Sequence, residues 1–259
     1  MSNLQFEWQS VRQFNGLQLF AAFAIPSAIA FAGFHVILPA IYASDVPAIV
    51  AWPTIASIML LGFAGAAVFL MKREADVLGI SLKARMCLKP LSLKQWGFAI
   101  GLLLIGVAAA AGLGSASQFW SNATGLNAPD YFPFFLDPSI DPMSTSSSKM
   151  TPDFYLKGAY WLIGLMLITL GLNILVEELY FRAWLLPKMQ FLGGASWVVN
   201  GFGFAFYHTF QLWLLPQILP LSLFMAFVVY KTRSIWPAFA IHLVVNSLTV
   251  AAMILLIVA

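Results

Sequence analysis

The chain has 259 residues, of which 61% are hydrophobic and only 9% are charged, and its net charge is +3. A soluble domain carries roughly 25% charged residues, so this composition excludes a protein whose whole surface faces water. The apolar runs of about 20 residues indicate membrane-spanning α-helices rather than the ~10-residue strands of a membrane barrel. The sequence shows no Gly-rich phosphate motif and no basic stripe typical of a nucleic-acid partner. Its one cysteine, Cys87, excludes an internal disulfide and a Cys-based zinc site.

Hydrophobic segments follow one another along most of the chain and predict an all-α integral membrane protein, a polytopic bundle of about seven to eight transmembrane helices. The first segment is longer than the 7–15 residue core of a signal peptide, so we expect an uncleaved first span. The sixth is short and is flanked by prolines at its start. The seven segments are approximately residues 17–40, 49–71, 96–114, 158–186, 196–215, 218–230 and 235–258.

The chain divides into four parts. Residues 1–16 form an N-terminal segment, and 17–114 hold the first transmembrane helices with a basic loop at 72–95. Residues 115–157 form a long loop, and 158–259 form the transmembrane core that carries most of the unusual polar residues. The basic residues of loop 72–95 are Lys72, Arg73, Lys83, Arg85, Lys89 and Lys94.

Basic residues predict the orientation of the chain. Loop 72–95, Lys188 and the pair Lys231 and Arg233 are expected on the cytoplasmic side by the positive-inside rule. The N-terminus then lies inside, and loop 115–157 lies outside. That loop is rich in Ser, Pro and aromatic residues, which favours an interfacial loop, with a lid or substrate-entry loop as the alternative.

Several polar side chains stand in apolar segments, where an ionisable group costs several kcal/mol unless it is paired or hydrated. They are therefore candidates for function. His35 stands alone in its segment and is expected to be a hydrogen-bonded interior histidine. The others are Glu177, Glu178 and Arg182 in the fourth segment, His208 in the fifth, and His242 with Asn246 in the seventh.

Helical spacing predicts how these side chains face one another. Glu178 and Arg182 are four residues apart, on one face of a helix, and are expected to form an ion pair. Glu177 points about 100° away and must find its partner on another helix. His242 and Asn246 are again four residues apart and present an imidazole and an amide to the same point.

The depth of these residues also agrees. Glu177 lies 188 − 177 = 11 residues before Lys188, which is about 16 Å along a helix. The same rise places His208 about 18 Å and His242 about 10 Å from the same membrane surface. We expect one chamber that opens to the cytoplasmic side, provided that the fourth helix continues to Lys188.

A carboxylate and a histidine can activate water as a general base, and a second histidine with an amide can stabilise an oxyanion. Together they indicate a hydrolase that attacks an amide with water. One alternative is a zinc protease, although no HExxH motif is present and Asn246 is a poor ligand. The other is a non-catalytic immunity or assembly factor in which these residues brace the helices.

Three motifs in the order found here resemble those of the CPBP family, the CAAX prenyl proteases and bacteriocin-processing enzymes also called the Abi family. They are Glu177-Glu178-x-x-x-Arg182, Phe204-x-x-x-His208 and His242-x-x-x-Asn246. The resemblance covers about residues 173–250. It implies an intramembrane glutamate protease with a helical-bundle fold.

The resemblance also implies a role for each matching residue. Glu177 and His208 would activate the water, and His242 and Asn246 would form the oxyanion site. The supporting residues would be Glu178, Arg182 and Phe204. No cofactor or metal is expected, the partners would be the lipid bilayer and a membrane-embedded or lipid-modified peptide substrate, and the expected location is a bacterial plasma membrane.

Overall fold

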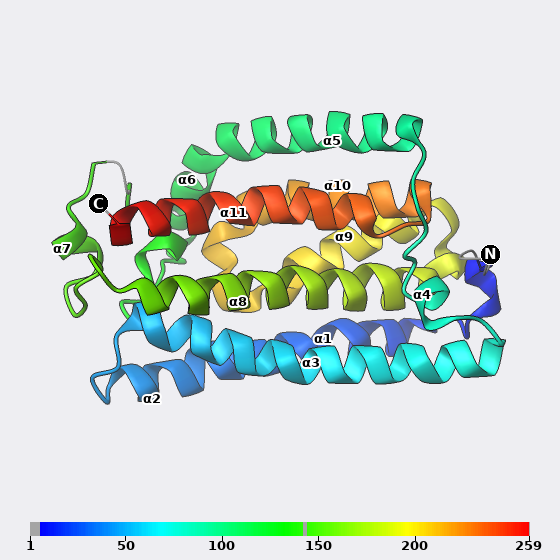
Figure 1. The fold of residues 1–259 in the computed structure, drawn as a ribbon, viewed down its shortest axis with the longest axis horizontal. Coiled ribbons are helices and arrows are strands. Elements are labelled where there is room, and N and C mark those ends of the chain that lie inside the picture. Colours follow the sequence, from blue (N-terminus) through cyan, green and yellow to red (C-terminus); the bar gives the residue numbers. More distant parts are fainter. Residues whose placement is uncertain (1–5, 142–143, 259) are drawn as a thin grey trace.

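The computed structural model describes residues 6–141 and 144–258, and every regular element within these ranges is helical. The expected all-α class is therefore confirmed. The predicted segment 1–16 and loop 115–157 lie partly outside the described residues, as does the last residue of the predicted core, Ala259. The long helices run side by side as a bundle, and α11 ends at the end of the bundle opposite to the one where the chain begins (Figure 1).

The bundle is built from seven long helices joined by short helical pieces. The long helices are α1 (Gly16–Ala32), α3 (Ala48–Leu78), α5 (Leu93–Gly112), α8 (Tyr160–Glu177), α9 (Ser196–Tyr207), α10 (Leu215–Thr232) and α11 (Trp236–Val258). The short α-helices are α2 (Leu38–Tyr42), α4 (Leu82–Arg85), α6 (Gly114–Thr124) and α7 (Ser147–Met150). Two segments are π-helical, η2 (Gly33–Ile37) and η4 (Glu178–Leu185). Four are 3-10 segments, η1 (Trp8–Ser10), η3 (Phe134–Leu136), η5 (Leu186–Ala195) and η6 (Thr209–Leu214).

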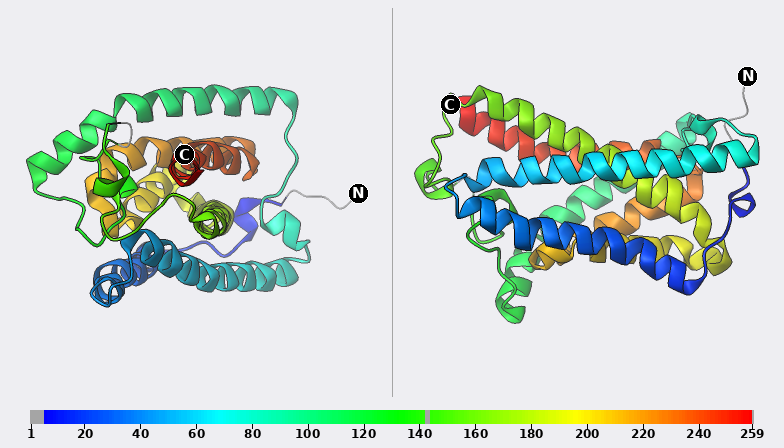
Figure 2. Two further views of the ribbon diagram at one scale, coloured as in Figure 1. Left: turned by 60° about the vertical axis from the view of Figure 1, so that its left-hand side comes forward. Right: turned by 90° about the horizontal axis from the view of Figure 1, so that it is seen from below.

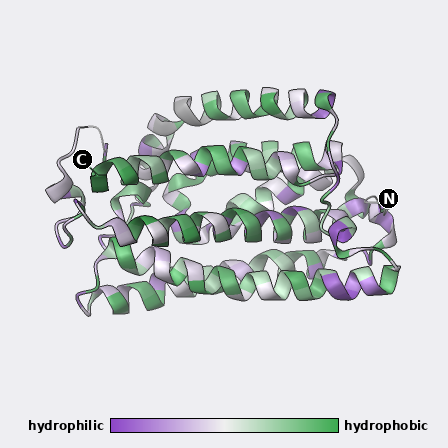
Figure 3. Ribbon diagram, viewed as in Figure 1, coloured by the Kyte–Doolittle hydropathy of each residue, from purple (hydrophilic) through white to green (hydrophobic). Residues whose placement is uncertain are grey.

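Several helical stretches are long and apolar enough to cross a membrane, so the chain is an integral membrane protein. Hydrophobic residues cover most of their length (Figure 3), and many large apolar side chains face outward, where only lipid can accept them without cost. The described residues contain five such stretches, and the predicted number of seven to eight spans is not confirmed. The five are Gly16–Tyr42, Ala48–Leu78, Tyr160–Tyr207, Thr209–Thr232 and Trp236–Val258.

The fourth predicted segment continues as far as the sequence argument requires. Helix α8 runs without a break into η4 and then into η5, and the first non-helical backbone angles come at Met189, followed by Gly193. The chain therefore turns just after Lys188. Gly193 has a φ of 55°, a conformation that glycine adopts without the strain a side chain would bring.

Two other predicted segments have different limits in the structure. Helix α10 begins at Leu215 rather than near residue 218, because Pro216 lies in its first turn, where proline is tolerated. The predicted fifth segment, 196–215, is broken after Tyr207, so that His208 follows the end of α9 rather than standing inside a helix.

The predicted loop 115–157 is largely packed against the bundle in its described part. Trp120 on α6 donates its indole N–H to the carbonyl of Leu212 at 3.0 Å. In return, Trp213 donates to the carbonyl of Leu136 at 2.6 Å. The end of the bundle that carries residues 125–157 is called the loop end below.

Small residues bring α9 close to its neighbours. A Cβ on Gly201 would lie only 2.9 Å from the Cα of Leu223 on α10, and a Cβ on Gly203 would lie 2.3 Å from the ring of Phe23 on α1. Glycine at such crossings lets membrane helices approach backbone to backbone. This contact fixes α9, and with it His208, inside the bundle.

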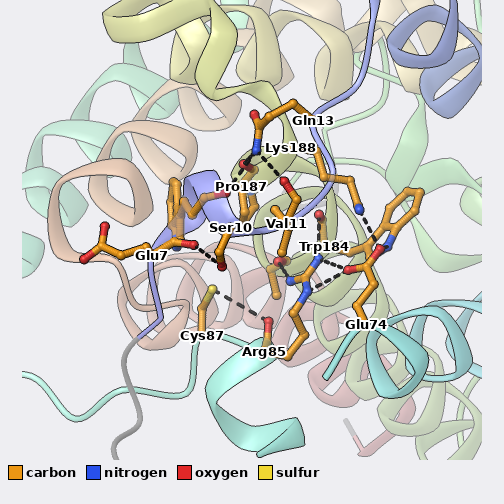
Figure 4. Close-up of polar contacts among 12 residues, drawn as sticks. Glu7, Ser10, Val11, Gln13, Glu74, Arg85, Cys87, Trp184, Pro187 and Lys188 are labelled. Carbon is orange, nitrogen blue, oxygen red and sulfur yellow. Dashed lines mark hydrogen bonds and ion pairs between the residues drawn. The ribbon is translucent and has the colours of Figure 1, made fainter. Parts of the chain in front are cut away.

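The opposite end, called the basic end below, consists of α4, η5 and the last turns of α3 and α10. It gathers the basic residues expected in the cytoplasm. Glu74 on α3 is the acid that unites them, since it pairs with Arg85 at 2.6 Å and with Lys188, and accepts from Trp184 at 3.2 Å (Figure 4). Arg85 also donates to the carbonyl of Ala183.

The orientation can be tested by labelling single cysteines. Lys83 at the basic end and Ser148 at the loop end are both exposed. Burial raises the pKa of the native Cys87 thiol to about 11, against the attraction of Arg85, so this thiol stays protonated and silent near neutral pH. In intact cells, a membrane-impermeant maleimide should label S148C and leave K83C unlabelled. Labelling of K83C alone would reverse the orientation.

The Glu74 cluster should contribute strongly to stability. E74Q leaves two cations, Arg85 and Lys188, without their carboxylate, and both side chains are almost completely buried. Breaking such a pair costs about 3 kcal/mol or more. We expect a clearly lowered Tm in detergent, whereas D76N, which breaks the exposed pair between Lys72 and Asp76, should change Tm little. Equal shifts for the two variants would contradict this assignment.

Candidate active site

The predicted polar residues come from the ends or faces of three helices and lie close together. Glu177 is the last residue of α8, and His208 directly follows α9. His242 and Asn246 occupy successive turns of α11, six and ten residues after its start at Trp236. Glu177, His208 and His242 are buried, with 4%, 8% and 7% of their surface exposed.

Glu177 lies between the two histidines. One carboxylate oxygen, Oε1, is 3.9 Å from Nε2 of His208, and the other, Oε2, is 3.9 Å from Nε2 of His242. These distances are too long for direct hydrogen bonds and suit a bridging water. Oε2 is buried and has no hydrogen-bond partner among the described residues. The carboxylate is therefore positioned to hold a water against either imidazole.

The backbone determines which nitrogen of His208 faces Glu177. Nδ1 lies 2.9 Å from the carbonyl oxygen of Phe204, which can only accept a hydrogen bond. Nδ1 must therefore carry the proton. In the neutral ring, Nε2 then presents a lone pair toward Glu177, as a base requires.

Glu178 forms the predicted ion pair with Arg182, at 3.5 Å, and both side chains are completely buried. It also makes a contact that helical spacing did not reveal, since Nδ1 of His242 lies 3.0 Å from its Oε1. This carboxylate holds the imidazole in place and favours a proton on Nδ1. Nε2 of His242 can donate to an oxyanion only when the ring carries both protons.

Arg182 is held on several sides. Its guanidinium lies over the ring of Phe204, 3.8 Å from the ring centre, and it contacts the carbonyl of Ser222 at 3.5 Å. This explains why phenylalanine stands four residues before His208. One aromatic ring packs against the cation, and its carbonyl orients the histidine.

Asn246 donates to a residue that the sequence analysis missed. Its Nδ2 is 2.9 Å from Oδ1 of Asn173 on α8. An available signal was the spacing, because Asn173 lies four residues before Glu177 and therefore on the same helix face. The contact orients the Asn246 amide and leaves its second N–H free to point elsewhere.

The catalytic candidates stand at one end of a cavity of about 310 Å³. From Glu177 the cavity extends along α8 to Met166, and from His242 along α11 to Val250, toward the loop end. Phe135 and Leu136 from the loop also contribute to its wall. The rest of the wall is mostly apolar, built from η2, α3, α9, η6 and α10.

Glu178 and Arg182 are fully buried, with Phe204 against the guanidinium, and neither side chain lines the cavity. On α10 the lining residues continue past Ser222, whose carbonyl contacts Arg182, to Met225. The sequence analysis expected a chamber open to the cytoplasmic side. The side of the membrane to which the cavity opens stays a prediction.

Part of the cavity wall consists of half-buried side chains. On α10 they recur at helical spacing and form one face, opposite a matching face of α11. Helix α5 runs beside α10 (Figure 2), and a Cβ on its Gly106 would lie 3.3 Å from Leu221. On η6, α10 and α11 the half-buried lining residues are Leu214, Gln217, Ile218, Leu221, Val245, Asn246 and Thr249, and others on α3, on α8 and in the loop are Trp52, Met59, Phe63, Phe135, Leu136, Leu170 and Asn173.

His35 lies outside this cluster. Its Nδ1 is 3.1 Å from the hydroxyl of Tyr131, and its Nε2 is 3.0 Å from the carbonyl of Phe210. These contacts fit the expected hydrogen-bonded interior histidine. Within the described residues, no group of three or more His, Cys, Asp or Glu side chains is arranged to hold a metal ion.

A comparison with known proteins finds a match to one family. No characterised protein and no solved structure matches the chain. Residues 159–248, which include Glu177, His208, His242 and Asn246, match the family described as "Type II CAAX prenyl endopeptidase Rce1-like". The cluster of buried polar residues on α8, just after α9 and on α11 thus lies in the part of the chain that matches the Rce1-like family of CAAX proteases.

Proposed function

We propose that the chain is an intramembrane endopeptidase that hydrolyses a peptide bond with water activated by Glu177 and His208. One observation carries this proposal. A buried carboxylate stands 3.9 Å from an imidazole nitrogen, at the end of a cavity inside a membrane bundle. The family of residues 159–248, a family of endopeptidases, supports the same reaction.

The reaction begins with a water molecule between Glu177 and His208. One of these groups takes a proton while the water oxygen bonds to the carbonyl carbon. Negative charge then develops on the carbonyl oxygen, where the free N–H of Asn246 and the doubly protonated ring of His242 would donate. The C–N bond breaks, and the proton taken from water passes to the leaving amine.

Glu178 and Arg182 would act through other residues. Glu178 holds His242 from behind, at 3.0 Å, and Arg182 balances the two neighbouring carboxylates in a site without bulk water. Burying two carboxylates side by side without a cation would be costly. Phe204 links this pair to His208 through its ring and its carbonyl.

The cavity supports a membrane-embedded or lipid-modified peptide as the substrate. Its wall is largely apolar, and part of it consists of half-buried residues on α10 and α11, two helices within stretches long enough to cross a membrane. A peptide that reaches Glu177 therefore comes through the bundle from the bilayer or from the loop end. Apolar chains suit this route, because they lose little on leaving lipid.

The central test compares protein termini in membranes of cells that carry the parent chain or E177Q. We expect a defined set of termini to disappear, since loss of a general base lowers rates by about 10²–10⁴-fold. H208A should remove the same set. D153N, which changes an exposed carboxyl on the loop, is the matched control and should keep every terminus.

Identical terminus maps for parent and E177Q would overturn the proposal. If deletion of the whole chain still produced a phenotype that E177Q corrects, the non-catalytic reading as an immunity or assembly factor would replace it. The polar residues would then serve to brace three helices.

A zinc mechanism predicts a different result from the same protein. Glu177 and the two histidines would need to supply three ligands at about 2.0–2.2 Å around one ion. We expect elemental analysis of purified protein that cleaves its substrate at full rate to show no stoichiometric zinc. One zinc per chain, with activity lost on chelation and restored by zinc, would support the metal mechanism instead.

A further inference from the structure

Asn173 has no part of its own in the reaction described above. It lies on α8, one helical turn before Glu177, and its half-buried side chain lines the same cavity. An amide in a membrane-spanning helix is costly unless it is hydrogen-bonded, because lipid offers no partners. The presence of an amide next to a proposed catalytic residue therefore calls for an explanation.

Two successive turns of α8 face two successive turns of α11. The helices lie side by side and run in opposite directions (Figure 1). On the first turn Glu177 meets His242, with 3.9 Å between Oε2 and Nε2. One turn further toward the loop end Asn173 meets Asn246, with 2.9 Å between Oδ1 and Nδ2. The proposed base and one proposed oxyanion donor thus lie on adjacent turns of facing helices.

The amide of Asn173 has two different ends. Its oxygen can only accept hydrogen bonds, and its nitrogen can only donate them. The oxygen accepts from Asn246, so the nitrogen needs an acceptor elsewhere. Glu177 supplies one, since the Asn173 side chain also hydrogen-bonds to the Glu177 carboxylate. Asn173 therefore joins a group that activates water to a group that stabilises the oxyanion.

The carboxylate determines which way both amides turn. An ionised carboxylate only accepts, so it attracts the N–H groups of Asn173 and leaves the oxygen of that amide for Asn246. Asn246 must then present its nitrogen to Asn173, and the second N–H on that nitrogen stays free for an oxyanion. If the Asn246 amide turned over, both of its N–H groups would move to the opposite side.

We propose that Asn173 is a positioning residue that links the Glu177 carboxylate to Asn246 and so keeps Asn246 turned as a donor to the oxyanion. Asn173 acts through Asn246, and its loss misaligns a donor that works in the transition state. This inference rests on the proposed function. It adds how the two halves of the site, the activated water and the oxyanion donor, are held in register.

The test uses purified full-length protein in lipid vesicles and a peptide that spans a cut site found by the E177Q comparison. N173A removes both ends of the amide. Loss of an oxyanion donor lowers kcat by about 10²–10³-fold, and a misaligned donor should keep part of its effect. We expect N173A to lower kcat about tenfold or more and to change KM by less than about twofold. An unchanged kcat would overturn the inference.

N200A is the matched control. Asn200 on α9 is fully buried and donates to the carbonyl of Phe181 at 2.8 Å, but it does not line the cavity. Each variant loses a buried hydrogen bond, so both should lower Tm, whereas only N173A should lower kcat per folded molecule. An equal fall of kcat in N200A would mean that lost stability explains both variants, and the inference would be wrong.

N173D separates the two ends of the amide with almost no change of shape. The aspartate keeps an oxygen that can accept from Asn246 but, when ionised, has no N–H to donate to Glu177. We expect kcat to fall as in N173A. A parental kcat in N173D would mean that the link to Glu177 has no part in orienting Asn246, and this result also refutes the inference if N173A does not fold.

A double-mutant cycle shows whether Asn173 acts through Asn246. N246A removes the donor itself, so N173A/N246A should be slower than N246A by no more than about twofold. Fully multiplied effects would contradict the inference. If N173A keeps the parental kcat while E177Q does not cleave, the inference fails and the proposed function stands. If E177Q cleaves the peptide as the parent does, both fall together.

Discussion

The buried pair of Glu178 and Arg182 is the interaction on which the rest of the site depends. Neither charge could remain at this depth alone, and the pair is tolerable only because further groups surround it. Phe204 lies against the guanidinium, and His242 approaches the carboxylate. In this way one ion pair on η4 contacts residues of both α9 and α11.

The same pair lies next to the cavity without lining it. From Glu177 the lining residues continue along α8 to Met166, and from His242 along α11 to Val250, toward the loop end. The candidate catalytic residues Glu177 and His242 lie directly beside this pair, in a buried part of the bundle where charges interact strongly.

Much of this site could be predicted because charged residues in apolar segments are rare and costly. Helical spacing correctly paired Glu178 with Arg182 and placed Glu177, His208 and His242 at one depth. Spacing could not show the contact between Glu178 and His242, which depends on how α11 rotates against α8. Nor could it show that α9 ends before His208, or that Pro216 begins α10, since these follow from tertiary packing and turn geometry.

Helix α5 has a further consequence for how the molecule moves. Of its described side chains only Ala99 is buried, and its closest approach to the bundle is at Gly106, which has no side chain. A helix that contributes so little buried surface separates from its neighbours at a lower free energy than the central helices do. Because α5 lies beside the α10 face that borders the cavity, we expect lipid composition and bilayer thickness to affect this part of the cavity wall through α5.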